Sequence, residues 1–189
     1  GLLWAGKADE PASMSFTRED AAAKDLSDAV VTVSRSGKIF AYSPDSSTLV
    51  TMEQEGQTWR SKTTAIKGFQ GPGPLSITAV GDKPVIYDQG GNSLVTPDGK
   101  VRDLGEDHIT GAVLQAPGDE ASGVLLATGD ELVTVPLSGQ GVTRQPASDQ
   151  GLTGTPAPPV FHRGCAYGAW AGSGAFVRAC TDASRNQAQ

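Results

Sequence analysis

One arrangement of apolar and polar positions recurs four times along this chain. An apolar run typical of a β-strand leads into a turn centred on glycine, and a second apolar run follows it. The fuller copies add a polar turn and a third apolar run. The copies begin at Val31, Ile77, Leu125 and Val160, so successive starts lie 46, 48 and 35 residues apart. Because a four-stranded propeller blade occupies roughly 40–50 residues, this repeat predicts blades.

The predicted fold is all-β, with four-stranded antiparallel blades in one propeller-like domain over residues 1–182. Crossings rich in Gly and Pro, at residues 68–74 and 145–158, suit a chain that passes from one blade to the next. An additional strand expected at residues 112–115 leaves the register of the third unit open. Residues 183–189 are polar and are predicted to form a disordered tail. The blade-like units are expected at about residues 29–66, 75–104, 112–145 and 159–180.

The ends of the chain carry incomplete units. Two short apolar runs, at residues 2–5 and 13–16, are predicted to be outer strands of a blade that lacks its inner strands. They could join the three-stranded fourth unit and close a small ring, or the chain could be a fragment of a longer propeller, since propellers use about four to eight blades. We favour the fragment, because the polar tail after Cys180 stands where an outer strand is expected. Exposed blade edges would then drive homodimerisation.

Composition and charge narrow the classes of function. Only 6% of the residues are aromatic, while glycine contributes 24 and proline 12, so frequent turns are expected and long helices are not. The net charge is −6 and the basic residues are scattered, whereas nucleic acids and anionic membranes attract clustered Lys and Arg. No apolar stretch is long enough to span a bilayer. We therefore expect neither nucleic-acid binding nor membrane insertion by this segment.

The two cysteines flank a predicted hairpin. If its turn is centred on Gly172 and Ser173, then Cys165 and Cys180 face one another across the two strands. A disulfide bond there would contribute about 3 kcal/mol to stability and would indicate an oxidising, extracytoplasmic location. The alternative is two free buried cysteines. A metal site is not expected, because no CxxC motif or Cys/His cluster accompanies them.

A few side chains are candidates for ligand contacts. His162 stands at the start of the fourth hairpin, but a single histidine without a partner is more often a surface turn residue. Trp59 and Trp170, with Trp4, could stack against a sugar or peptide, although one aromatic residue per blade is more often packing between blades. His108 follows two carboxylates that could form a weak cation site, and a solvated loop explains it equally well.

Two segments resemble a known family. The run PPVFHRGCAYGAW at residues 158–170, with VRAC at residues 177–180, looks like blades in the N-terminal ectodomain of large actinobacterial fibronectin type III proteins. The runs DAVVTV at residues 28–33 and GKIF at residues 37–40 are similar to the first repeats of that ectodomain. The resemblance implies a cell-envelope protein with a membrane anchor before this region and fibronectin or immunoglobulin-like modules after it. It supplies no catalytic residues.

Together these patterns predict a non-enzymatic, extracytoplasmic interaction or scaffold module without a cofactor. Its partner would be a cell-wall glycan or a protein. One alternative is a propeller-type enzyme, glycosidase or quinoprotein-like, with a site at the mouth of the central channel. Another is a passive spacer that lifts downstream modules from the membrane. Several carboxylates that converge at the channel mouth would favour the enzyme, whereas apolar side chains that plug the channel would favour the scaffold.

Overall fold

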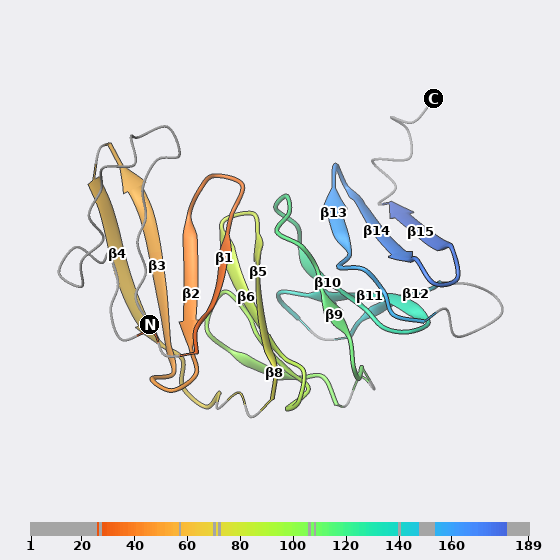
Figure 1. Ribbon diagram of the computed structural model, residues 1–189, viewed down its shortest axis with the longest axis horizontal. Coiled ribbons are helices and arrows are strands. Elements are labelled where there is room, and N and C mark those ends of the chain that lie inside the picture. Colours follow the sequence, from red (N-terminus) through yellow and green to blue (C-terminus); the bar gives the residue numbers. More distant parts are fainter. Residues whose placement is uncertain are drawn as a thin grey trace.

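The regular structure of this chain consists entirely of β-strands. The computed structural model describes residues 26, 28–56, 58–69, 71, 73–105, 107, 109–139, 141–147 and 154–180. These residues form fifteen strands in four antiparallel sheets, which lie one after another along the molecule in Figure 1. The predicted all-β, propeller-like class is therefore confirmed. The described residues contain no helix that could cross a membrane.

Each sheet is a meander in which every strand pairs with the next strand in sequence. We number the sheets as blades 1 to 4 in chain order. The predicted strands at residues 2–5 and 13–16 and the tail at 183–189 lie outside the described residues.

Blade 1 contains β1 (Val30–Val33), β2 (Ile39–Ser43), β3 (Thr48–Glu55) and β4 (Thr58–Ala65). Blade 2 contains β5 (Leu75–Val80), β6 (Lys83–Asp88), β7 (Ser93–Val95) and β8 (Val101–Asp103). Blade 3 contains β9 (Val113–Leu114), β10 (Gly123–Ala127), β11 (Glu131–Pro136) and β12 (Thr143–Pro146). Blade 4 contains β13 (Val160–His162), β14 (Cys165–Trp170) and β15 (Ala175–Cys180).

The hairpin of β14 and β15 has the predicted register. Trp170 pairs with Ala175 beside the turn, and the pairing continues without a slip to Cys165 opposite Cys180. These two cysteines form a disulfide bond, as the position of the Gly172–Ser173 turn predicted. The bond thus joins directly opposed residues of neighbouring strands.

The third copy of the sequence repeat does not occupy the same place in its blade as the other copies. The run that begins at Leu125 forms β10 and β11, because the short strand β9 pairs with the other side of β10. The copies that begin at Val31, Ile77 and Val160 form the first two strands of their blades instead. In blade 3 the repeat therefore forms the second and third strands, not the first and second. Apolar runs around a glycine turn define a hairpin, but they do not determine which strands of the blade that hairpin forms.

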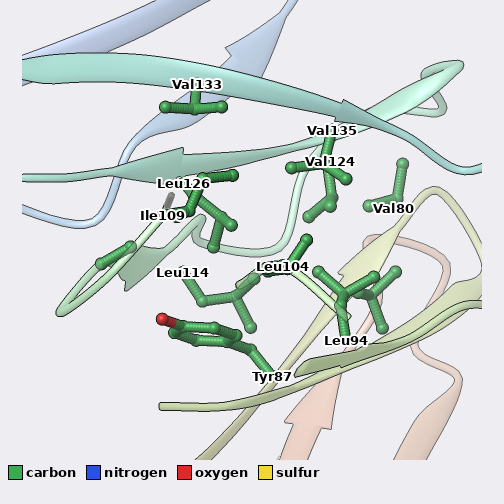
Figure 2. Packing of buried hydrophobic residues seen from close by; sticks show 12 residues of the cluster. Val80, Tyr87, Leu94, Leu104, Ile109, Leu114, Val124, Leu126, Val133 and Val135 are labelled. Carbon is green, nitrogen blue, oxygen red and sulfur yellow. The ribbon is translucent and has the colours of Figure 1, made fainter. Parts of the chain in front are cut away.

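Apolar cores between neighbouring blades hold the sheets together. The inner strands β1 and β5 are neighbours, and so are β5 and β9. Blade 2 contributes to two cores, because Ile86 packs towards blade 1 while the adjacent Tyr87 packs towards blade 3. Figure 2 shows this second core, in which Tyr87 and Leu94 lie across from Leu126 and Val133. Strands covered on both faces account for the nearly continuous apolar runs in the sequence.

We expect these cores to carry most of the stability. Leu126 is fully buried between blades 2 and 3, so Leu126→Ala should lower the free energy of unfolding by about 2–5 kcal/mol, through lost burial and a cavity. The matched control is Leu137→Ala, because Leu137 lies only half-buried at the margin of the same core and should lose clearly less. Chemical denaturation measures both values. Equal losses would mean that the inter-blade core is not the main source of stability.

Candidate functional site

The turns that follow the inner strands bring charged side chains of all four blades together. We call this group the inner-turn cluster. Ser36 Oγ of blade 1 donates a hydrogen bond of 2.6 Å to Asp82 Oδ1 of blade 2. Lys83 Nζ of blade 2 lies 2.6 Å from Glu120 Oε1, on the loop before β10 of blade 3. The cluster consists of Arg35, Ser36, Asp82, Lys83, Asp119, Glu120, His162 and Arg163.

Asp119 is the centre of this cluster and contacts blades 1 and 4. Arg35 Nη1 lies 3.1 Å from Asp119 Oδ1, and His162 Nδ1 lies 2.9 Å from Asp119 Oδ2. The backbone N–H of Arg163 also donates to Oδ2, at 3.2 Å. Arg163 can present this N–H because it has a positive φ of 47°, in a two-residue hairpin turn with Gly164. The partner of His162 lies 43 residues away in the sequence, so local sequence patterns could not predict it.

These contacts hold the pKa of Asp119 below its ordinary value. The hydrogen bond from the Arg163 backbone has the largest effect. Burial opposes it, and the charge of Arg35 and the contact with His162 lower the pKa further. The pKa of Asp82 is also lowered, chiefly by the hydroxyl of Ser36. A general acid near neutral pH needs a raised pKa. Neither Asp82 nor Asp119 has the raised pKa that such an acid requires.

Backbone rather than apolar side chains fills the space beside this cluster. Gly118 accepts a hydrogen bond from Gly81 N–H and donates one to the carbonyl of Ala79, both at 3.0 Å. A Cβ atom at Gly118 would lie 3.0 Å from the carbonyl oxygen of Phe161, which is tighter than most contacts allow. The loop that contains Gly118 is thus wedged between blades 2 and 4. The carboxylates of Asp82, Asp119 and Glu120 each have a partner in a neighbouring blade.

The three predicted ligand contacts do not form one site. Trp170 is fully buried between blades 3 and 4, and its Nε1 donates a 2.8 Å hydrogen bond to the carbonyl of Thr128. Trp170 is therefore a core residue and not a ligand contact, because solvent cannot reach its ring. Trp59 packs half-buried at the side of blade 1 that faces away from blade 2. Trp4 and His108 lie outside the described residues.

Sequence reasoning missed a groove between blades 1 and 2. It has a volume of about 640 Å³, within the range of roughly 300–1,000 Å³ that is typical of ligand sites. Strands β3 and β4 have eight residues each, whereas β7 and β8 have three, so blade 2 does not cover the outer part of blade 1. These unequal strand lengths are the signal that could have revealed the groove.

The groove has an apolar floor and charged walls. Lys62 and Lys67 are exposed on its wall and form no ion pair within the described part of the chain. Lys38, in contrast, lies 3.0 Å from Glu53. The floor is formed by Phe40, Leu49, Ile66, Ile86 and Val95. The walls include Lys38, Lys62, Lys67 and Lys83 and the acidic residues Glu53, Asp82 and Asp98.

A second groove, of about 450 Å³, lies between blades 2 and 3. Its main charged side chain, Arg102, is already engaged. The Arg102 guanidinium donates to Asp107 Oδ2 at 3.0 Å and to the carbonyl of Gly141 at 2.7 Å. Arg102 therefore ties the two blades together and is not free for a ligand. Among the described residues, no group of three or more His, Cys, Asp or Glu side chains is placed to hold a metal ion.

Comparison with known proteins gives a similar fold but no family. No protein-family model and no curated protein matches the sequence. Among solved structures, the chain is similar to a catalytically inactive variant of virginiamycin B lyase from Staphylococcus aureus, solved with quinupristin. The two share 15% sequence identity and superpose with a TM-score of 0.47. The similarity covers 82% of this chain and 56% of the lyase chain, so the chain spans little more than half of that structure.

The role of Asp119 predicts a pH-dependent contribution to stability. Because its folded pKa is lowered, the ionised carboxylate stabilises the fold fully above the unfolded value of about 3.9, and this contribution is lost as the pH falls through the folded pKa. At pH 7, Asp119→Asn should lower the free energy of unfolding by about 1 kcal/mol, since its ion pairs are partly exposed.

Denaturant titrations of both proteins between pH 2 and pH 7 measure this difference. The difference in free energy of unfolding between wild type and Asp119→Asn should shrink progressively as the pH falls below about 4. The control is Asp45→Asn, at an exposed aspartate in the turn between β2 and β3, which should leave stability unchanged. A loss that stays the same at every pH would show that the variant acts through packing and not through the charge.

Proposed function

We propose that this chain is a non-enzymatic interaction module of an extracytoplasmic protein, and that the groove between blades 1 and 2 is its binding surface. The observation that carries the proposal is a contrast between the two candidate sites. Each carboxylate of the inner-turn cluster already has a partner, whereas the groove is open and two of its lysines, Lys62 and Lys67, have no ion-pair partner among the described residues. A catalytic centre requires groups that are free to exchange protons with a substrate.

The location proposed for the module is the outside of a cell, in a cell-envelope protein. The Cys165–Cys180 bond supports an oxidising compartment, because disulfides persist there and are rare in the cytosol. The resemblance of residues 158–170 to envelope ectodomains of the fibronectin type III proteins agrees with this location.

The partner proposed for the groove is an acidic, extended segment of another protein. Lys62 and Lys67 favour carboxylates, and the apolar floor favours alternating aliphatic side chains. A glycan is a poorer fit, because Phe40, the only aromatic residue among the described residues that line the groove, is 1% exposed and offers no face for stacking. The negative charge of the whole chain would at the same time repel acidic proteins elsewhere on its surface.

Binding to defined probes tests this function. The probes are synthetic peptides that alternate glutamate with valine, the same peptides with lysine in place of glutamate, and soluble peptidoglycan fragments. We expect saturable binding of the glutamate peptides alone. Lys62→Glu combined with Lys67→Glu should weaken it at least about tenfold, equivalent to 1.4 kcal/mol. Arg178→Glu, which reverses a charge on blade 4, should leave the affinity unchanged.

Two results would contradict the proposal. One is the absence of saturable binding to the glutamate peptides, or binding that the two groove substitutions do not weaken. The other is turnover of a glycoside or lactone panel that disappears in the Asp119→Asn variant, which would instead support an enzyme centred on the inner-turn cluster.

A further inference from the structure

The outward face of blade 4 is open to solvent and carries the apolar side chains of Tyr167, Ala169 and Phe176 next to the exposed Arg178. Phe176 on β15 is the most exposed of the large apolar side chains in the described residues, at 63%. Its ring lies 6.2 Å from the ring of Tyr167 on β14, and Ala169 beside them is also exposed. The opposite face of the same sheet is buried against blade 3 through Trp170 and Val177. An exposed aromatic patch of this kind on a sheet indicates a contact surface.

Blades 1 and 2 carry the same kind of aromatic residue in a position that the next blade covers. Tyr42 on β2 is buried under blade 2, and Tyr87 on β6 is buried under blade 3. Tyr167 matches Tyr42 in register, since each pairs with the first residue of its inner strand. Blade 4 therefore presents a face that, in the earlier blades, forms the contact with a following sheet.

The other end of the row of blades also exposes residues whose counterparts are buried. Val31 and Val33 on the inner strand β1 are 48% and 49% exposed. They point away from blade 2, because they pair with Ala41 and Ile39 of the opposite core. On the next inner strand, Ala79 faces the preceding blade and is fully buried. The remainder of this face of blade 1 is already covered, so the open part is confined to β1.

We propose that these two open faces bind each other between two copies of the chain. Tyr167 and Phe176 of one copy pack on Val31 and Val33 of the second, and the reverse contact forms at the other ends. Each copy carries both surfaces of this contact, the outward face of blade 4 and the exposed side of β1. The corresponding surfaces of neighbouring blades pack against each other within one chain. Two such contacts obey a twofold axis and close the assembly.

A charge exchange at the two faces tests this contact. Wild type should show concentration-dependent dimers in sedimentation velocity experiments. Phe176→Lys or Val33→Glu, each on its own, should raise the dimer dissociation constant at least about tenfold, because a charge enters an apolar contact. An equimolar mixture of the two variants should recover dimers. In the mixed dimer one contact is entirely wild type, and the other places Lys at position 176 against Glu at position 33.

The control is Val101→Lys, because Val101 is also exposed but lies on β8 of blade 2, away from both open faces. This variant should dimerise like wild type, and thermal unfolding checks that all variants are folded. A wild-type chain that stays monomeric at every concentration overturns the proposal. So does a mixture that stays monomeric, and so does a dimer that Phe176→Lys disrupts but Val33→Glu does not, since that pattern would mean contact between two blade 4 faces.

Discussion

The central blades of this chain have two apolar faces, and a single sheet cannot bury either face by itself. The sheet of blade 2 illustrates the constraint, because adjacent residues Ile86 and Tyr87 point in opposite directions and both are fully buried. Burial of a side chain of this size contributes about 1.5–3 kcal/mol, so the gain depends on a neighbouring sheet on each side. The sheets stack in a row because each apolar face must be covered by a neighbouring sheet. The exposed faces of blades 1 and 4 are those that no described sheet covers.

Polar contacts fix how the packed sheets are aligned rather than whether they pack. Asp119 connects the inner turns of blades 1, 3 and 4, and Arg102 connects the outer parts of blades 2 and 3. Contacts of this partly exposed kind are individually weak, at about 0–1 kcal/mol. They also have a chemical consequence, because the Arg163 backbone hydrogen bond, together with the ion pairs, keeps the pKa of Asp119 low. The surface left for a ligand is then the groove that arises where eight-residue strands of blade 1 extend beyond three-residue strands of blade 2.

Local patterns in the sequence predicted the hairpins and the cysteine pairing, because interactions between residues close in sequence determine both. The turn at Gly172 and Ser173 specified the register that joins Cys165 to Cys180, and strand-like runs specified the hairpins. Contacts between distant segments could not be predicted in this way. The position of β9 as the inner strand of blade 3 depends on its contact with β5, and the partner of His162 comes from another blade. Trp170 shows the same limit, because only the packing of two sheets decides whether a tryptophan is buried or available.

Native-state hydrogen exchange tests most directly whether faces shared between blades hold the molecule together. If they do, amides of β6, β10 and β11, which lie in sheets covered on both sides, exchange only through global unfolding and report one common free energy. Amides of β1 and β15, next to the open faces, exchange through openings of lower free energy. Four sheets that exchange independently, or a centre that is no better protected than the ends, would contradict this account.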